Sequence, residues 1–178
     1  MEYNLPLGYC LTRNVKDPAY GTGEAGCIDF FVPEFDEQFL IDLKTKNPGL
    51  ASHDIALILQ RNSISLSPGE AICIPSGVHA RLEPHTALTA FNKSGVATKM
   101  RLIRGAEYVD SDYQGEIHLH LINAGEERVH IEAGQKIIQF SYVPVFRANM
   151  TKFETKEKMY DGFSSERGEN WQGSTGTK

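Results

Sequence analysis

The sequence has few cysteines, no long apolar run and fewer basic than acidic residues. Its three cysteines, Cys10, Cys27 and Cys73, are far apart and odd in number, which argues against a disulfide or zinc framework and predicts reduced core residues. No 18 consecutive residues are apolar, and the N-terminus has no basic stretch followed by an apolar run. We therefore expect a soluble protein of a reducing cytoplasm, without a membrane partner.

The charge balance restricts the partners. Eighteen Lys and Arg residues against 23 Asp and Glu residues give a net charge of −5, which is the wrong sign for a protein that coats nucleic acid. We expect no nucleic-acid partner. A small anion is still a compatible ligand, because a few N–H groups and basic side chains can bind it locally.

The chain length of 178 residues suits one globular domain whose core needs neither disulfides nor a structural metal. Apolar and polar residues alternate with a period of two in several short stretches, which predicts β-strands. Turn-forming residues separate these stretches, and many short strands with regular turns indicate an all-β sandwich, jelly roll or barrel. The predicted strands span residues 63–66, 71–74, 87–91, 116–122, 128–131 and 136–143.

Residues 36–46 are the one helical candidate. Asp36 can cap the helix, and the Asn-Pro-Gly sequence at 47–49 ends it. We expect a short surface helix within an otherwise all-β fold. Its apolar face would contain Phe39, Leu40 and Leu43.

The composition changes in the last part of the chain. Residues 161–178 contain no Ala, Val, Leu, Ile or Met and are rich in Gly, Ser and Thr. Such a segment cannot offset its ordering entropy by burial, so we predict a β domain over residues 1–160 and a flexible tail over residues 161–178. The glycines, hydroxyls and one arginine of the tail suit a terminal phosphate, although a frayed polar terminus explains them as well.

Two further segments contain residues that suit a nucleotide. Residues 92–97 follow a predicted strand and combine a cation, a hydroxyl and a glycine, a combination that an ordinary turn also allows. Residues 110–116 place two carboxylates and an aromatic ring on one hairpin, or form a solvated loop. His118 and His120 project from the same face of a strand, but no third ligand has a metal-binding spacing, so we interpret them as surface or interface residues.

Five segments of the chain form a set: residues 25–30, 93–97, 109–117, 134–139 and 167–176. In this order they resemble the five sequence motifs of the trimeric dUTPases. Together they extend across nearly the whole chain. The pattern of strands and turns agrees independently with the jelly-roll fold of that family, so the resemblance predicts a dUTPase-like distorted barrel, with a phage-type member as one option.

The resemblance implies hydrolysis of dUTP to dUMP and pyrophosphate, with Mg²⁺ bound mainly by the three phosphates and by water. Asp110 would orient and deprotonate the water that attacks the α-phosphorus. Tyr113 would lie against the deoxyribose and leave no room for a 2′-hydroxyl. Asp29 would support the water shell of the metal.

The same resemblance implies the other substrate contacts and the assembly. The tail would close over the γ-phosphate as a mobile lid, and Trp171 would replace the family's usual tail phenylalanine over the base. The sites would form between the subunits of a homotrimer, with each tail crossing to a neighbour. The implied substrate-binding residues are Lys93, Ser94, Gly95, Val109, Tyr113, Gln139, Arg167, Trp171, Gly173, Ser174, Thr175 and Gly176.

Three positions depart from the family pattern. Lys93 stands where the family usually has an arginine, which keeps the charge but loses the bidentate geometry. Arg104 and Glu107 stand where the family commonly has Asn and Gly on the hairpin that reads uracil. A different deoxypyrimidine triphosphate, dCTP or a 5-substituted dUTP, is therefore an alternative substrate. We expect both side chains to face solvent, because two unpaired charges beside a neutral base would be costly.

Two other functions are alternatives to dUTP hydrolysis, and one insertion has two interpretations. A related dCTP deaminase would need an acid/base glutamate where this chain has His120. A non-catalytic nucleotide-binding regulatory protein would have no use for a water-activating Asp110. Residues 32–62 form a longer connection than is usual in the family, and this insertion is either a tolerated surface segment or the binding element for a protein partner.

Overall fold

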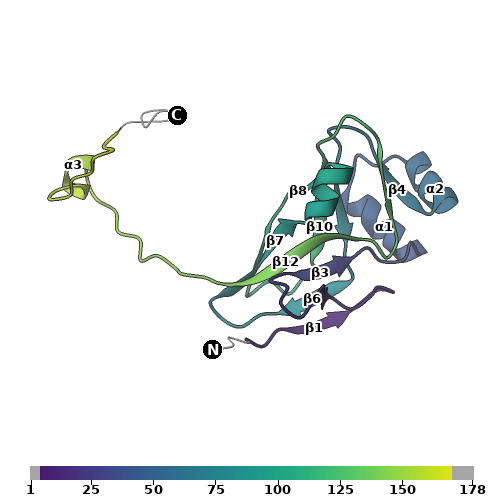
Figure 1. The fold of residues 1–178 in the computed structure, drawn as a ribbon, viewed down its shortest axis with the longest axis horizontal. Coiled ribbons are helices and arrows are strands. Elements are labelled where there is room, and N and C mark those ends of the chain that lie inside the picture. Colours follow the sequence, from purple (N-terminus) through teal and green to yellow (C-terminus); the bar gives the residue numbers. More distant parts are fainter. Residues whose placement is uncertain (1–4, 170–178) are drawn as a thin grey trace. The chain divides into compact units, whose positions relative to one another are not determined.

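The computed structural model describes residues 5–169. The chain divides into two compact units, Met1–Phe146 and Arg147–Lys178. The first unit contains the strands, drawn from purple to green in Figure 1. It ends before the boundary between residues 160 and 161 that the change in composition predicts. Within the described range, no helix is both long enough and apolar enough to cross a membrane.

Short antiparallel strands build the first unit. One sheet has the order β2-β3-β12-β7-β9, a second has the order β5-β10-β8, and β1-β6 and β11-β4 form two pairs. The predicted all-β class is confirmed. The bounds are β1 Gly8–Leu11, β2 Ala19–Tyr20, β3 Ile28–Phe31, β4 Ser63–Leu66, β5 Ala71–Pro75, β6 Val78–Arg81, β7 Thr86–Asn92, β8 Leu102–Arg104, β9 Tyr108–Asp110, β10 His118–Asn123, β11 Val129–Glu132 and β12 Lys136–Pro144.

The alternation in sequence becomes an alternation in burial. In β10, Leu119 and Leu121 are almost fully buried, whereas His118 and His120 on the other face are partly exposed. The long strand β12 pairs with β3 on one side and with β7 on the other. Its Phe140 packs against Phe30 of β3 with ring centres 4.6 Å apart. Each such buried side chain contributes about 1.5–3 kcal/mol to stability.

The predicted helix forms as α1, Glu37–Lys46. The Asp36 carboxylate caps it by accepting a hydrogen bond from the Phe39 N–H at 2.7 Å. The helix is not a mere surface element as predicted, because Phe39 and Leu43 of its apolar face are fully buried in the core. In consequence this part of the insertion contributes to the stability of the β domain.

The end of α1 is fixed to the sheet by Asn47. Its side-chain amide donates a hydrogen bond to the Cys73 carbonyl at 2.9 Å and accepts one from the Cys73 N–H at 2.8 Å. These two bonds satisfy both backbone groups of a residue in β5. The helix therefore has a defined place against the second sheet.

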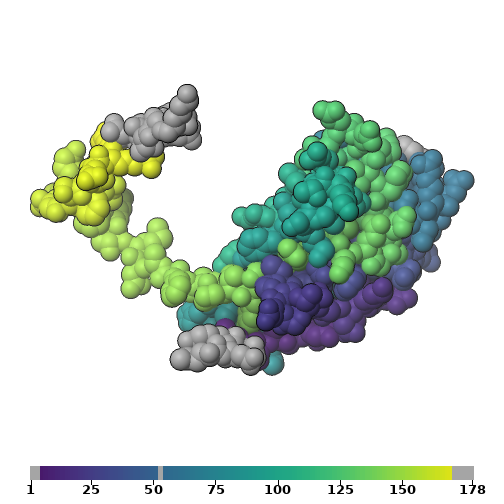
Figure 2. All heavy atoms as spheres, in the orientation of Figure 1, coloured from purple at the N-terminus to yellow at the C-terminus, as the bar shows by residue number. Residues whose placement is uncertain are grey.

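A second, unpredicted helix follows as α2, Ser52–Arg61. Its N-cap residue is Ala51, which has no side-chain oxygen, and the Asp54 carboxylate instead accepts a hydrogen bond from the Ala51 N–H at 3.0 Å. Ile58 is buried. Figure 1 shows α1 and α2 together at one side of the strands, and Figure 2 shows this blue segment at the right-hand edge of the first unit. The remaining helical segments are the π-helix Val96–Met100 and α3, Lys156–Met159.

The three cysteines are free, as predicted, but they are not all core residues. Cys10 is exposed on the edge strand β1, and Cys27 and Cys73 are partly buried. Burial raises the pKa of both partly buried thiols above the ordinary value. These two side chains are therefore held as neutral thiols at physiological pH.

Candidate active site

A cavity of about 200 Å³ lies beside the hairpin that follows β9. Val109, Asp110 and Tyr113 are on its wall, together with the apolar side chains of Ile117 and Phe140. Three of the predicted site residues thus lie at one hollow that is partly apolar and carries a carboxylate. This combination suits a nucleoside, whose base and sugar have apolar faces and whose reacting phosphate needs a base.

Local hydrogen bonds determine the shape of this hairpin. The Tyr113 N–H donates to the Asp110 carbonyl at 3.2 Å, and the Tyr113 hydroxyl donates to the Glu116 carbonyl at 3.0 Å. Gly115 is required between them, because a Cβ added there would lie 2.4 Å from the Tyr113 hydroxyl oxygen. The tyrosine ring is therefore held at the cavity and is not a freely rotating surface side chain.

A second group of predicted residues surrounds Asp29. Asp29 is on β3, is 3% exposed, and forms ion pairs with Lys93 and with Lys136, the latter at 3.1 Å. Gln139 of β12 lies directly opposite Asp29 in the sheet, and its side-chain amide donates to the Asn92 carbonyl at 3.1 Å. The strand pairing thus brings together the motif segments 25–30, 93–97 and 134–139.

The lysines determine the charge state of Asp29. Burial alone would raise the pKa of Asp29, but Lys93 and Lys136 lower it below its ordinary value. The carboxylate is therefore ionised at neutral pH, and each of its oxygens already has a lysine partner. Among the side chains that the structure describes, no group of three or more His, Cys, Asp or Glu could hold a metal ion.

Ser94 and Gly95 lie directly before the π-helix Val96–Met100. Gly95 has ordinary right-handed helical angles, and a Cβ added to it would meet no heavy atom within 4 Å. Neither the backbone nor the packing of this chain thus requires a glycine at this position. Its small size leaves the local backbone accessible to a ligand such as a phosphate.

The two groups of residues are separated along β7. Asp110 lies opposite Ala87 in the sheet, whereas Gln139 lies opposite Phe91. Four residues of strand correspond to about 13 Å. Within the described part of one chain, the residues around Asp110 therefore lie together and the residues around Asp29 lie together, but the two groups do not contact each other.

The tail residues are only partly within the described range. Arg167 is exposed and its N–H donates to the Ser165 hydroxyl at 3.3 Å. The other predicted tail residues lie outside the described residues, and their roles stay predictions: Trp171, Gly173, Ser174, Thr175 and Gly176.

The two unusual charges on the hairpin neutralise each other. Arg104 and Glu107 form an ion pair in which 30% and 52% of their side chains are exposed. The Arg104 guanidinium also lies 5.9 Å from the centre of the Phe91 ring. The expectation that both side chains face solvent holds only in part, because most of the Arg104 side chain is covered and the half-exposed Glu107 lines the cavity, while their ion pair leaves neither charge unpaired.

His118 is a residue near this site whose environment the sequence does not reveal. Its Nε2 atom is buried and has no hydrogen-bond partner among the described residues. Burial lowers the pKa of His118 below its ordinary value, and the nearby Lys46 adds to this, while Glu116 opposes it. The folded protein therefore favours the neutral form of the His118 imidazole over the protonated form.

Replacing His118 with glutamine should therefore make the protein less sensitive to acid. Below pH 6.5 the unfolded chain takes up a proton at His118 more readily than the folded one, so the wild type loses stability through this residue as the pH falls. The expected effect on the unfolding constant is at most about tenfold per pH unit, the limit for one proton. Urea midpoints at pH 8 to 5 measure it.

His85→Asn is the matched control, because His85 is exposed and has a positive φ of 63° that asparagine tolerates. It should keep the acid sensitivity of the wild type. If the urea midpoints of His118→Gln and His85→Asn change with pH to the same extent, the partly buried imidazole of His118 has no part in acid sensitivity.

The chain is similar to known proteins in sequence and in fold. The profile of the dUTPase family matches residues 40–175. A deoxyuridine 5'-triphosphate nucleotidohydrolase of Stutzerimonas stutzeri is 31% identical over 95% of this chain and 99% of its own length. One of Shewanella sediminis is 34% identical over 74% of this chain and 84% of its own length.

Solved structures support the fold. The dUTPase of Staphylococcus bacteriophage 80alpha with dUPNHPP has a TM-score of 0.70 at 20% identity and covers 96% of this chain and 98% of its own. A mutant dUTPase from phage phi11 of S. aureus, described with a structural Mg(II) ion, has a TM-score of 0.62 at 16% identity over 85% and 99%. The predicted dUTPase-like fold is confirmed, and the profile match with the identity over almost the whole chain shows that this chain belongs to the dUTPase family.

Proposed function

We propose that this member of the dUTPase family hydrolyses dUTP to dUMP and pyrophosphate. The observation that carries the proposal is the position of Asp110, which lies on the wall of the cavity beside Tyr113. No hydrogen bond or ion pair engages the Asp110 carboxylate in the described part of the chain. An unengaged carboxylate at the edge of a nucleoside-sized cavity can accept a proton from a water molecule that attacks the α-phosphorus.

The other residues have supporting roles in this proposal. Tyr113 packs against the deoxyribose, and Val109 contributes an apolar wall. Lys93 supplies a cation to the triphosphate, and Gln139 supplies an amide donor. Ser94 and Gly95 supply a hydroxyl and an accessible backbone, and the tail residues from Arg167 onward cover the γ-phosphate.

Magnesium is the metal that we propose for the reaction. The ionised Asp29 carboxylate, whose oxygens pair with Lys93 and Lys136, suits the water shell of a Mg²⁺ that arrives with the triphosphate. When bound, Mg²⁺ would neutralise charge on the phosphates. Asp29 would act on it only indirectly, through water or through Lys93.

We also propose that the protein is a homotrimer with sites between subunits. The separation of the Asp110 group from the Gln139 group along β7 supports this, because a second chain can supply the missing phosphate contacts. Large apolar side chains that are exposed in the second unit support it too. They are Met150, Phe153, Met159, Tyr160 and Phe163.

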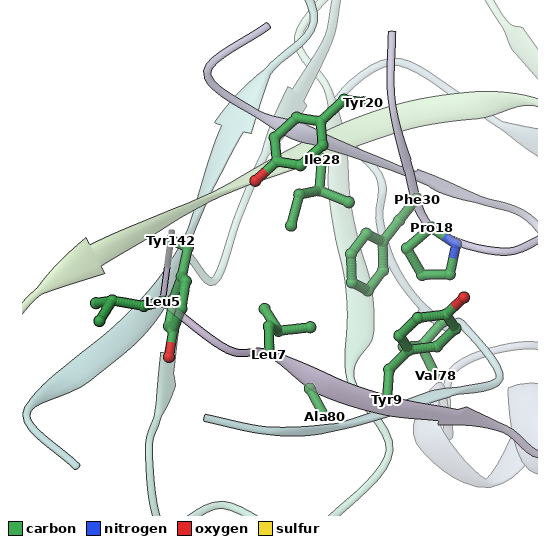
Figure 3. A pocket seen from close by; sticks show the side chains of 10 residues that line it. All are labelled: Leu5, Leu7, Tyr9, Pro18, Tyr20, Ile28, Phe30, Val78, Ala80 and Tyr142. Carbon is green, nitrogen blue, oxygen red and sulfur yellow. The ribbon is translucent and has the colours of Figure 1, made fainter. Parts of the chain in front are cut away.

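A second cavity of the first unit supports the same assembly. It has a volume of about 340 Å³ and lies between β1, β3 and β6 (Figure 3). Figure 3 shows Leu7, Ile28 and Phe30 directed toward its centre. An apolar hollow open to solvent is typical of a surface that another chain covers.

The alternatives have less support. In β10, His120 occupies the position at which a deaminase would need its glutamate, and His120 Nδ1 accepts a hydrogen bond from the Ala106 N–H at 2.7 Å. A purely regulatory binding protein does not need the unengaged Asp110. An altered base specificity is the alternative that an experiment must decide, since Glu107 lines the cavity.

The experiment is a comparison of kcat/KM for dUTP, dCTP, dTTP and 5-hydroxymethyl-dUTP. We expect dUTP to be preferred by about 10- to 100-fold or more, because each mismatched buried polar group costs about 1–3 kcal/mol. A preference for another nucleotide would refute the assignment of dUTP but not that of Asp110. Absence of pyrophosphate release from all four would favour the non-catalytic alternative.

Two further proposals concern the cellular location of the enzyme and a protein partner. Free cysteines agree with a cytoplasmic location. An apolar groove of about 470 Å³ lies between α1 and α2, with Ile41 and Leu59 exposed along it. This groove is where a protein partner of the insertion over residues 32–62 would bind, and that partner stays a prediction.

A further inference from the structure

Arg13 joins two segments that are far apart in the sequence. Its Nε donates to Glu116 Oε1 at 2.6 Å and its Nη2 donates to Glu116 Oε2 at 2.9 Å, so two hydrogen bonds hold the carboxylate. The same Nη2 donates to Asp42 Oδ2 at 2.6 Å. Asp42 is on α1 and Glu116 lies just before β10. Arg13 therefore connects the inserted helix to the end of the cavity hairpin.

Two of the three side chains in this ion-pair cluster are largely protected from solvent. Only 9% of the Arg13 side chain and 15% of the Glu116 side chain are exposed, whereas 32% of the Asp42 side chain is exposed. The guanidinium carbon lies 6.0 Å from the centre of the Phe39 ring of α1. Gly77 approaches closely as well: its N–H donates to Glu116 Oε1 at 2.6 Å, and a Cβ added to it would lie 2.8 Å from the Arg13 Cβ. These contacts restrict the Arg13 side chain to a single position.

The charges in the cluster depend on one another. Burial alone would raise the pKa of Glu116, but the hydrogen bonds from Arg13 and from the Gly77 N–H lower it. The hydrogen bond from Arg13 also lowers the pKa of Asp42. All three groups are therefore charged at neutral pH, and removing one partner leaves the others imperfectly compensated in a partly buried place.

Glu116 is also the hydrogen-bond partner of Tyr113. The Tyr113 hydroxyl donates to the Glu116 carbonyl, while the Glu116 side chain is held by Arg13. The next residue, Ile117, is anchored to β6 because its N–H donates to the Val78 carbonyl at 2.9 Å. A displacement of Glu116 would therefore move the Tyr113 ring at the cavity wall.

We infer that Asp42 and Arg13 are positioning residues that determine where Tyr113 lies, and that the inserted helix thereby helps the enzyme to select deoxyribose over ribose. The inference rests on the proposed function, in which the Tyr113 ring lies against the sugar. Among the described residues that line the cavity, Glu116 and Tyr113 are present and Asp42 and Arg13 are not. The two act through the hairpin without touching the nucleotide.

The test is the ratio of kcat/KM for dUTP to kcat/KM for UTP. In Asp42→Asn we expect this ratio to fall roughly tenfold, the size of one weakened hydrogen bond between charged groups, with more of the change in KM for dUTP than in kcat. Arg13→Lys keeps a positive charge but loses the paired hydrogen bonds to Glu116, so its ratio should fall further. Asp42→Glu keeps the carboxylate and should recover most of the selectivity.

Asp17→Asn is the control, because Asp17 accepts a hydrogen bond from Tyr9 at an exposed site away from the cluster. Its ratio should equal that of the wild type. Amide hydrogen exchange of residues 110–117 should be faster in Asp42→Asn than in Asp17→Asn. An unchanged ratio and unchanged exchange in Asp42→Asn would overturn the inference. A wild type that does not hydrolyse dUTP would contradict the proposed function instead, and the exchange measurement would still test the positioning of the hairpin.

Discussion

Replacing Asp110 with asparagine should reduce the turnover of dUTP by about 10²- to 10⁴-fold, the usual contribution of a general base. Asparagine has almost the same shape and can still accept a hydrogen bond, but its amide cannot take a proton from water. The affinity for the nucleotide should change little, because the cavity wall and the phosphate contacts are retained. The loss should therefore appear in kcat and in kcat/KM to the same extent.

Asp112→Asn is the matched control for this experiment. Asp112 belongs to the same hairpin, carries the same charge and is exposed. It should retain turnover close to that of the wild type, which separates the loss of a base from the loss of a negative charge. Near-normal turnover in Asp110→Asn would remove Asp110 from the mechanism and leave the family assignment unaffected.

Half of the described strands were predictable because their signal is local: they are β4, β5, β7, β10, β11 and β12. In β10 the period of two in the sequence corresponds to the buried face, whereas in β12 a register shift buries both Ile137 and Ile138. The short strands β1, β2, β3, β6, β8 and β9 were not predicted, because two to four residues give only a weak signal of alternation.

The helix α1 was also predictable from a local signal, since Asp36 and the Asn-Pro-Gly sequence mark its ends. The helix α2 has the helical spacing at Ile55, Ile58 and Leu59, but Ala51 provides no capping signal.

The positioning cluster could not be predicted from sequence. Arg13 lies 29 residues from Asp42 and 103 residues from Glu116, and each belongs to a segment without a distinctive pattern of its own. Only the fold brings them within hydrogen-bond distance. The motif resemblance, by contrast, located Asp110 and Tyr113 at the cavity, because a motif carries information about a site without specifying the packing that supports it.

The proposed site uses residues from both ends of β7. The motif segments that contain Lys93 and Asp110 follow each other along the chain, yet they lie near opposite ends of β7. A complete site needs both, so the oligomeric state is part of the mechanism that we propose. The tail is the third component, and its contribution can be separated from the other two by shortening the chain.

Truncation after Gly162 should leave a folded trimer whose kcat/KM for dUTP is lower by about 100-fold, as expected when a group that positions the substrate is lost. The truncated chain keeps all strands and the exposed apolar residues Met150 and Phe153, so light scattering should still give a mass of about three subunits. It loses Arg167 and every glycine and hydroxyl that would cover the γ-phosphate. Full activity of the truncated trimer would refute the role of the tail as a lid.

Trp171 allows the same role to be followed in the full-length protein, because it is the only tryptophan of the chain. Its fluorescence should change on addition of a non-hydrolysable dUTP analogue, since an indole that moves from water onto a base changes its environment. Arg167→Lys keeps the charge but loses the bidentate contact, so it should require more analogue for the same signal. If the signal is unchanged at saturating analogue, Trp171 does not cover the base. If Arg167→Lys responds at the wild-type concentration, the guanidinium fork does not hold the phosphate, and the tail must close through its backbone and hydroxyl groups instead.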